Sequence, residues 1–297
     1  MRRFLAAILT CISGSALSGV TVTDRDLTTL FDMPPERVVV LDWALAEQVL
    51  DLGISPVGAP ELGLYEIWVS KPALPETTID VGLRTEPNLE GIAALNPDVI
   101  LASDLDPALE NALARIAPTV VFKAWNSGHD NVAAAREIFL QLASLFQRTT
   151  EAKAKLAEQE IRLTEIAARI AALNVPTQAT AIRLNDEASV WIYGTNSFPQ
   201  HVLERLGLSS EITLAPSRWG VAQRPLAALA EVEEGVLLAI EPHMDGGAAK
   251  EGPLWQALPA VARGHYAEVP PVWSYGGILS LERHAEAFLA ALERMVE

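Results

Sequence analysis

The side chains that most often bind metals or transfer protons are scattered through this sequence. The five histidines are His129, His201, His243, His265 and His284. No two of them stand at the spacing that would place both on one face of a helix as metal ligands. His243 has an acidic neighbour, Asp245, but both lie in a stretch, 241–247, that contains proline and glycines. We therefore expect this pair on a solvated loop and no metal site.

Motifs of known catalytic machinery are absent from the sequence. It contains no G-x-G-x-x-G, no Walker loop, no G-x-S-x-G and no H-E-x-x-H. Acidic residues are abundant, but no pair is singled out by its spacing as the acid and base of a glycosidase. The missing nucleophile motif weighs against an exported α/β hydrolase, which stays open as one alternative function.

The composition is that of an acidic globular protein. The chain has 297 residues, half of them hydrophobic, so it can bury a sizeable core and is not disordered. Acidic residues outnumber basic ones by 38 to 22, a formal net charge of −16. Binding to nucleic acid requires a positive face, and docking on anionic lipid requires clustered basic residues. The charge therefore argues against both kinds of partner.

The first 18 residues are typical of a secretory signal peptide. Two arginines precede an apolar run at 4–12, and Ala-Leu-Ser at 16–18 fits the small residues at a cleavage site. The apolar run is far shorter than the roughly 20 residues that span a bilayer. Cleavage after Ser18 removes Cys11, the single cysteine. A mature protein without cysteine suits an oxidising compartment. The alternative is a lipoprotein that keeps a lipidated Cys11. We predict export to the periplasm and no membrane span.

Strand and helix patterns alternate in the first half of the chain. The short apolar runs that predict strands are 37–41, 54–57, 99–101 and 119–122. The runs with helical spacing are 44–52, 89–95 and 108–116. Asn88 is the expected N-cap of the second helix. This alternation predicts a mainly parallel sheet that helices cover on both faces.

The middle of the chain predicts one long helix. No glycine or proline occurs between Gly128 and Pro176, and an apolar stripe repeats every seven residues along 149–173. At 1.5 Å per residue this helix is about 37 Å long, more than one small domain needs. A rigid helix that connects two lobes explains this length.

The alternation resumes in the second half. Strands are predicted at 179–184, 190–193, 236–240 and 266–269, and helices at 198–206 and 279–296. We therefore predict an α/β protein of two α/β lobes joined by one long rigid helix, with the ligand cleft between the lobes. The predicted parts after the signal peptide are an N-terminal lobe at 19–148, the connecting helix at 149–174 and a C-terminal lobe at 175–297.

One segment resembles a known family. Residues 80–90 read DVGLRTEPNLE, and the phrase G-x-x-x-x-P-N-L-E in it is typical of class III periplasmic binding proteins. The resemblance is closest to the ferric-hydroxamate siderophore-binding proteins of bacterial iron ABC importers. Further matching segments include LDW at 41–43, NPD at 96–98 and VPPVWSYG at 269–276. The resemblance extends from about Arg37 to the end of the chain and implies two α/β lobes bridged by a rigid helix.

The resemblance also implies the ligand contacts and the chemistry of binding. Carried over residue by residue, the contacts are Trp68, Arg84, Ser103, Trp219, Trp273 and Tyr275. A ferric tris-hydroxamate already surrounds its iron with oxygens, so neither a protein metal ligand nor a cofactor is expected. Arg84 offers a planar charged donor for the chelating oxygens. The aromatic residues offer rigid apolar walls for the arms of the siderophore.

One position departs from the family. A tyrosine that contacts the hydroxamates in the family member is replaced here by Asp106. A carboxylate accepts hydrogen bonds and would repel an anionic chelate. The siderophore is therefore expected to differ, as a cationic one or as another hydroxamate of the ferrioxamine type.

Protein partners follow from the same resemblance. Binding proteins of this class dock on an inner-membrane ABC permease, with its ATPase, through one acidic residue on each lobe. Glu90 matches the position on the first lobe, whereas Glu231 and Glu233 both stay open for the second. We expect a monomer that captures a ferric siderophore; haem, cobalamin or another chelate stays open as the ligand.

Overall fold

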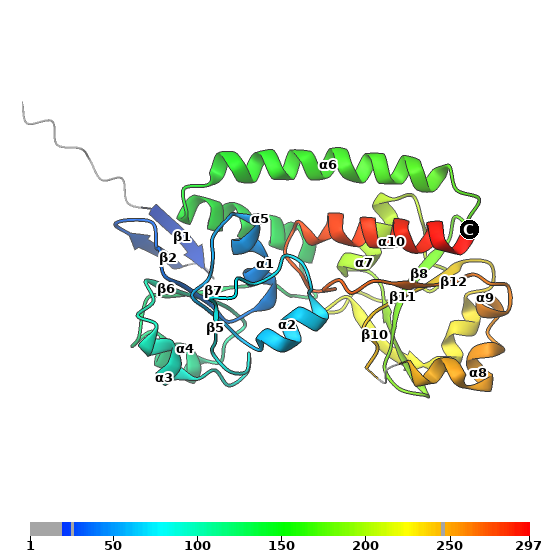
Figure 1. Ribbon diagram of the computed structural model, residues 1–297, viewed down its shortest axis with the longest axis horizontal. Helices are drawn as coiled ribbons and strands as arrows, with labels where there is room; N and C mark the ends of the chain where they lie inside the picture. The colour runs from blue at the N-terminus through cyan, green and yellow to red at the C-terminus, as the bar shows by residue number, and fades with distance from the viewer. Residues whose placement is uncertain (1–19, 25–26, 245–246) are drawn as a thin grey trace, which may run out of the picture.

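The computed structural model describes residues 20–24, 27–244 and 247–297. It has two α/β lobes side by side along one long helix (Figure 1). The predicted fold class is therefore confirmed. The predicted signal peptide, 1–18, and Cys11 lie outside the described residues, as does Asp245. Within the described part of the chain, no helix combines the length and the apolar character needed to cross a membrane.

The N-terminal lobe is built on a parallel sheet. Its strands are β3 (Val38–Val40), β4 (Gly58–Ala59), β5 (Ile79–Asp80), β6 (Val99–Ser103) and β7 (Thr119–Phe122). They are ordered β5-β4-β3-β6-β7, and every neighbouring pair is parallel. Its helices are α1 (Trp43–Asp51), α2 (Leu62–Trp68), α3 (Leu89–Ala94), α4 (Pro107–Leu113) and α5 (Asn131–Leu145). Alternate residues of β3 enter cores on opposite faces of the sheet, which explains why the strand is apolar throughout.

The strand predicted at 54–57 lies one step further along the chain, which corrects that prediction. The segment that pairs with Val39 is Gly58 of β4. A Cβ on Gly58 would come within 2.7 Å of the Leu95 side chain and 2.8 Å of that of Val81. Close packing therefore requires glycine at the pairing position. Because glycine is not counted as an apolar residue, the apolar pattern of the sequence does not extend to this strand.

An antiparallel hairpin precedes the N-terminal sheet and is not predicted by the sequence pattern. Its strands are β1 (Val20–Asp24) and β2 (Leu27–Phe31). Val22 and Phe31 are buried in the same core as residues of α5. The hairpin thus closes the end of the lobe beside that helix.

The C-terminal lobe is built on a mixed sheet. Its strands are β8 (Ala179–Leu184), β9 (Ser189–Tyr193), β10 (Val221–Pro225), β11 (Val236–Ile240) and β12 (Tyr266–Val269). The order is β10-β9-β8-β11-β12; β8, β11 and β12 are parallel, and β9 is antiparallel to both of its neighbours. The connection between β8 and β9 is too short for the crossover that a parallel pair requires. This part of the chain therefore forms a hairpin inside an otherwise alternating lobe.

The helices of the C-terminal lobe lie between its strands along the chain, except for α10, which follows the last strand. They are α7 (Phe198–Arg205), α8 (Pro253–Gln256), α9 (Pro259–Ala262) and α10 (Ser280–Val296), with short 3₁₀ segments η1 (Leu226–Glu231) and η2 (Ala248–Glu251).

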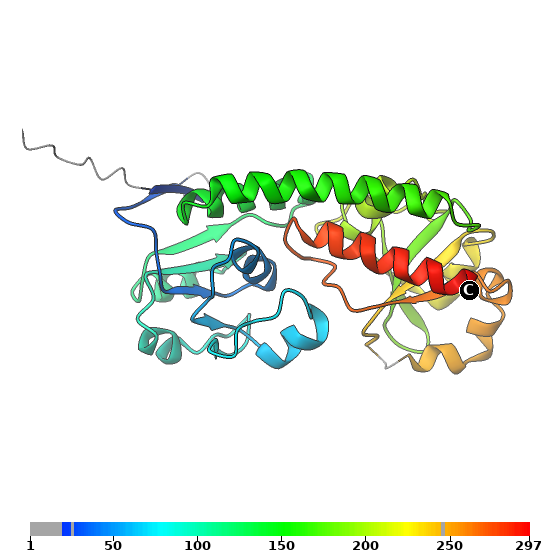
Figure 2. The ribbon, with the colours of Figure 1, turned by 45° about the horizontal axis from the view of Figure 1, so that its top comes forward.

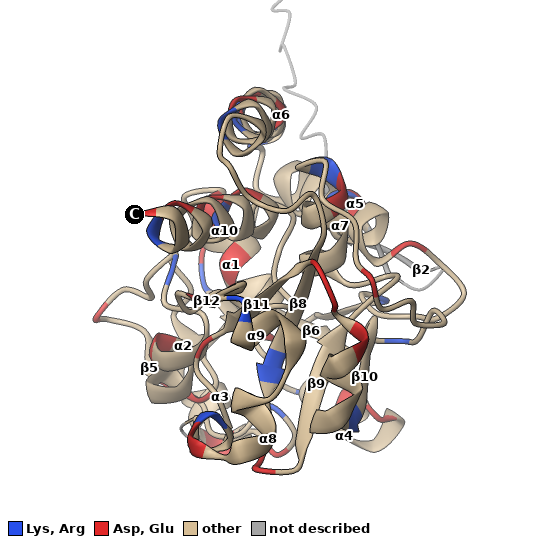
Figure 3. Ribbon diagram, turned by 90° about the vertical axis from the view of Figure 1, so that its right-hand side faces the viewer, with Lys and Arg blue, Asp and Glu red and all other residues tan. Residues whose placement is uncertain are grey.

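The long helix α6 (Thr149–Ala171) runs along both lobes (Figure 2). Its buried stripe includes Leu156, Leu163 and Ile170, and the helix packs against α5 and α10. Two ion pairs, Arg162–Glu286 and Arg169–Glu293, link α6 to α10. Basic and acidic residues are interspersed on these helices (Figure 3). Exposed pairs of this kind stabilise little, so the buried stripe is what holds α6 on both lobes.

A buried ion-pair cluster joins the two lobes directly. Arg283 of α10 donates from Nη1 to Oε2 of Glu47 at 3.0 Å and from Nη2 to Oδ1 of Asp51, both on α1. The Glu47 side chain is 1% exposed. Burial raises the pKa of Glu47, and the nearby Arg283 guanidinium opposes this shift. The cluster therefore ties the first helix of one lobe to the last helix of the other.

Candidate ligand-binding site

A largely apolar cavity of about 500 Å³ lies between the lobes. The N-terminal lobe contributes Trp43, Leu64, Trp68 and Arg84. The C-terminal lobe contributes Arg183, Trp191, Tyr193, Met244, Trp273 and Tyr275. A cavity of this size with apolar walls and a few charged groups is typical of a small-molecule site. Four of the residues named from the sequence, Trp68, Arg84, Trp273 and Tyr275, line it together.

The aromatic walls are built by edge-to-face contacts across the lobes. Trp273 lies 4.9 Å from the Trp43 ring and 6.2 Å from that of Trp68, and Tyr275 lies 5.2 Å from Trp273. Trp43 is further fixed by its Nε1, which donates to the Pro60 carbonyl at 3.1 Å. Such contacts hold the rings in defined orientations, so the walls are formed before any ligand binds.

Arg84 is held at the cavity by a turn and by two neighbours. The turn uses Gly82 at φ +92°, a conformation that glycine adopts without strain. The Arg84 guanidinium lies 3.7 Å over the Trp43 ring, and its Nε donates to Oε2 of Glu61 at 2.5 Å. The side chain is still 35% exposed. Arg84 therefore has a carboxylate partner and also presents part of its guanidinium to the cavity.

Ser103 and Asp106 lie in an adjoining hollow of about 520 Å³ that shares Arg84 with the main cavity. The Ser103 hydroxyl donates to Oδ2 of Asp42 at 2.9 Å, and Asp42 is the N-cap of α1. Burial raises the pKa of Asp42, and the Ser103 hydrogen bond opposes this shift. Asp106 caps α4 by accepting from the backbone N–H groups of Ala108 and Leu109. Its carboxylate is therefore engaged by a helix N-terminus, although the residue lines the hollow.

Trp219 connects the hollow with the main cavity. Its ring lies 5.6 Å from Trp125 and 5.6 Å from Tyr275, and it is 40% exposed. The next residue, Gly220, has no room for a Cβ, which would come within 2.2 Å of the Ser197 nitrogen. The structure thus brings all six residues named from the sequence into two adjoining hollows, four in one and three in the other, with Arg84 lining both.

Several cavity residues are missing from the sequence prediction: Trp43, Leu64, Arg183, Trp191, Tyr193 and Met244. Arg183 could have been identified from the sequence, because it is a single arginine in the otherwise mostly apolar strand β8. A charged residue in a buried strand needs an explanation, and here the explanation is its place at the cavity. The other five are apolar or aromatic residues that the sequence cannot distinguish from core.

Glu90 lies apart from both hollows. It is an exposed residue in the first turn of α3, whose N-cap, Asn88, accepts from the Gly91 N–H at 2.9 Å as predicted. A first-turn acid is favoured by the helix dipole. In the other lobe, Glu231 forms an exposed ion pair with Arg224 at 3.1 Å.

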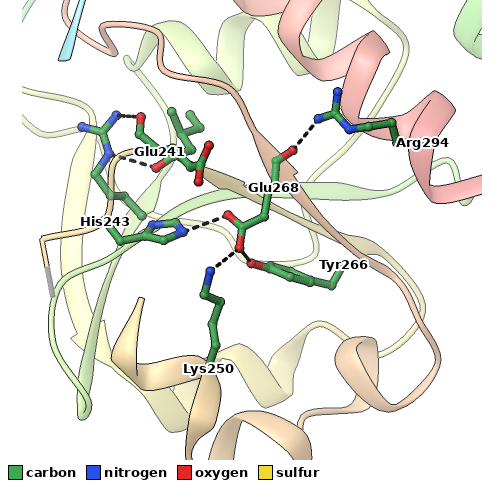
Figure 4. Close-up of polar contacts among 8 residues, drawn as sticks. Glu241, His243, Lys250, Tyr266, Glu268 and Arg294 are labelled. Atoms are coloured by element: carbon green, nitrogen blue, oxygen red, sulfur yellow. Dashed lines mark hydrogen bonds and ion pairs between the residues drawn. The ribbon is translucent and has the colours of Figure 1, made fainter. Parts of the chain in front are cut away.

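His243 lies on a loop as expected, but its side chain is not solvated, which corrects that part of the expectation. Its side chain is 3% exposed, and its Nε2 is 2.9 Å from Oε2 of Glu268. The Glu268 carboxylate also accepts from Lys250 at 2.5 Å and from the Tyr266 hydroxyl (Figure 4). Among the described residues, no group of three or more His, Cys, Asp or Glu side chains is placed to hold a metal ion.

Replacing Glu268 with glutamine is expected to lower the free energy of unfolding at pH 7 by about 1–2 kcal/mol. Burial alone raises the pKa of Glu268, but hydrogen bonds from His243, Lys250 and Tyr266 lower it to about 2. The pKa of about 2 in the folded protein lies below the value of about 4.3 in the unfolded chain. The ionised Glu268 therefore stabilises the fold fully above about pH 4.3, and this stabilisation is lost as the pH falls through about 2. Urea unfolding at pH 7, 4.5 and 3 measures this trend.

The matched control is Glu234→Gln, which removes an exposed carboxylate paired with Arg263. We expect this variant to match the wild type at each pH. A Glu268→Gln deficit that stays constant from pH 7 to pH 3 would contradict the assigned pKa shift.

Comparisons with known proteins agree with this geometry. Residues 38–272 match the family described as periplasmic binding protein. The Iron(3+)-hydroxamate-binding protein FhuD of Escherichia coli K12 is 34% identical over 250 residues, 83% of each chain. The crystal structure of the Fe3+-Desferal-bound siderophore-binding protein FhuD of Vibrio cholerae is 42% identical, with a TM-score of 0.85 over 88% of this chain and 99% of that one. The Fe(3+)-citrate-binding protein YfmC of Bacillus subtilis is 28% identical over 276 residues, 90% of this chain and 84% of the relative. This chain is a member of the periplasmic binding protein family.

Proposed function

We propose that the protein is the solute-binding component of an ABC importer and captures a ferric hydroxamate siderophore. The observation that carries this proposal is the aromatic cavity between the lobes with Arg84 at its wall. The relatives named for ferric hydroxamate and for siderophore binding support the ligand class. The protein acts by binding and release, with no chemical conversion of the ligand.

The proposed site uses the two hollows for different parts of one ligand. Arg84, which both hollows share, donates to the oxygens that chelate the iron. Trp68, Trp273 and Tyr275 contact the arms in the main cavity, whereas Ser103 and Trp219 contact the ligand from the adjoining hollow. The siderophore supplies all iron ligands, so the iron is cargo and the protein needs no cofactor.

The proposed setting is the periplasm, reached through the signal peptide at 1–18. Relatives from Escherichia coli and Bacillus subtilis bear the names periplasmic protein and lipoprotein, which support export. The partners are an inner-membrane permease and its ATPase, and the protein acts as a monomer. The lobes at 19–148 and 175–297 move little relative to each other, because α6 packs along both and Arg283 joins α10 to α1.

A fluorescence titration tests the function. Ferric Desferal, ferric citrate, haem and cobalamin are added in turn to the purified protein, whose cavity contains several tryptophans. Saturable quenching by ferric Desferal, with the ligand recovered unchanged, is expected. Quenching by haem or cobalamin alone would assign another chelate, and conversion of the ligand would assign an enzyme. Quenching by none of the four would contradict the proposal.

Glu90→Lys is expected to reduce uptake while leaving siderophore affinity within a few-fold of wild type. Glu90 is exposed on α3 and lies in neither hollow. A surface charge that pairs with a permease arginine affects mostly the association rate and is screened by salt. Uptake of radioactive iron by cells, together with the quenching titration, separates transport from capture.

Glu151→Lys is the matched control, because Glu151 is also an exposed first-turn acid, on α6. It is expected to transport normally. If both reversals reduce uptake equally, the effect is one of net charge, and Glu90 has no specific docking role.

A further inference from the structure

An arginine lines the C-terminal wall of the cavity without a carboxylate partner. Arg183 belongs to β8 and is 4% exposed. Its Nε donates to the Ile240 carbonyl at 3.2 Å, and its Nη2 lies 3.4 Å from the Glu241 carbonyl. Among the described residues, none of the ion pairs includes Arg183. Two carbonyl dipoles therefore solvate this buried cation, and no carboxylate of the described residues forms an ion pair with it.

Aromatic side chains also lie near Arg183. Its guanidinium lies 4.8 Å from the ring of Trp68, which belongs to the other lobe, and Trp191 stands directly opposite on β9. Burial raises the pKa of Tyr275; Tyr193 adds to this shift and Arg183 opposes it. Tyr275 is therefore a neutral phenol at physiological pH and cannot serve as the counter-charge.

The two arginines of the cavity, Arg84 and Arg183, differ in whether a carboxylate pairs with them. Arg84 is already paired with Glu61, and the hollow beyond it contains the carboxylates of Asp42, Asp104 and Asp106. Asp104 is paired with Arg218 at 2.8 Å, and the other acids of this hollow still outnumber its cations. On the C-terminal wall, Arg183 has no ion-pair partner among the described residues. A guanidinium cannot lose its proton, and a buried charge without a partner is costly. A ligand that brings an anionic group to Arg183 removes this cost.

We propose, resting on the proposed function, that Arg183 forms a carboxylate subsite and that the protein prefers a ferric hydroxamate with a carboxylate on one arm. Arg84 faces the chelate, and Arg183 binds the carboxylate at the opposite wall. This preference is the reverse of the cationic siderophore expected from Asp106. The Asp106 carboxylate is engaged by the N-terminus of α4 and does not set the charge of the main cavity.

A matched pair of ligands tests the subsite. Desferal has a free amine at the end of one arm; acetylation makes that arm neutral, and succinylation gives it a carboxylate. Wild-type protein is expected to bind the ferric succinyl form about 10-fold more tightly than the ferric acetyl form, as a charge-assisted contact predicts. Arg183→Met is expected to abolish this preference, so that the variant binds the two ferric forms with equal affinity. Arg205→Met, which removes a surface arginine of α7, keeps the preference.

Each outcome decides between the alternatives. Equal affinity of wild type for both ligands overturns the subsite and leaves the proposed function standing. An Arg183→Met variant that loses both ligands equally places Arg183 against the shared chelate and also overturns it. Failure of wild type to bind either ligand contradicts the proposed function instead. If circular dichroism shows that Arg183→Met is unfolded, the wild-type preference and its retention in Arg183→Lys decide the question.

Discussion

Substitution of Arg84 by alanine is expected to weaken binding of ferric Desferal by about 10- to 150-fold. A charge-assisted hydrogen bond contributes roughly 1.5–3 kcal/mol, and each 1.4 kcal/mol is a factor of about ten in affinity. The guanidinium stacks on Trp43 at 3.7 Å and is fixed by Glu61, so it reaches the chelate without losing much freedom on binding. The quenching titration measures the loss, and circular dichroism checks that the variant is folded.

Two further variants identify what Arg84 contributes. Arg84→Lys should recover only part of the affinity, because a point charge cannot reproduce a planar fork. Alanine at this position also leaves the Glu61 carboxylate unpaired beside the cavity. If Arg84→Ala/Glu61→Gln regains wild-type affinity, Arg84 serves only to neutralise Glu61. A loss that persists in the double variant supports donation to the ligand.

Substitution of Arg283 by methionine is expected to lower the free energy of unfolding at pH 7 by about 3–5 kcal/mol. Arg283 is the cation shared by Glu47 and Asp51, which are both buried between the lobes. Removal of one partner from a buried ion pair leaves an uncompensated charge, and the cost of that charge exceeds the value of the pair itself. Urea unfolding measures the change.

The pH dependence separates this explanation from a simple packing defect. In the variant, burial keeps the pKa of Glu47 raised and no cation opposes the shift. A carboxyl whose pKa is higher in the folded protein than in the unfolded chain stabilises the fold below the unfolded pKa of about 4.3. This stabilisation is lost as the pH rises. The deficit should therefore be largest at pH 7 and smaller at pH 4.5.

The matched control is Arg169→Met, which breaks an exposed pair with Glu293 and should stay within about 1 kcal/mol of the wild type. An Arg283→Met deficit that is the same at both pH values would show lost packing instead of an unpaired carboxylate.

Local patterns in the sequence predict most of the secondary structure. The strands at 119–122, 179–184, 236–240 and 266–269 lie at the predicted residues. The signal is clearest at 236–240, because a strand buried on both faces is an uninterrupted apolar run. The long helix is predicted to within two residues at its end, since its apolar stripe repeats without glycine or proline. Strand β10 is missed, because an edge strand that is partly exposed, contains Gln223 and Arg224 and ends in proline has no such signal.

For the binding site as well, the sequence predicts some features and only the structure shows the others. The resemblance names residues that the fold brings into two adjoining hollows, but it does not reveal that Glu61 is the partner of Arg84. Asp106 is read from the sequence as a charge that faces the ligand, whereas its carboxylate caps a helix. The sequence shows which side chains are present, and only the fold shows which of their atoms are already engaged.

By itself, the sequence determined the two-lobed α/β class, the long helix and the family, because each of these depends on periodicity or on contiguous motifs. The tertiary structure decided the charge balance of the cavity and the connection between the lobes. Arg183 meets Trp68 across the lobes, and Arg283 meets Glu47 across 236 residues of chain. Contacts of this kind depend on how the two lobes are set against each other along α6, and no local pattern encodes that arrangement.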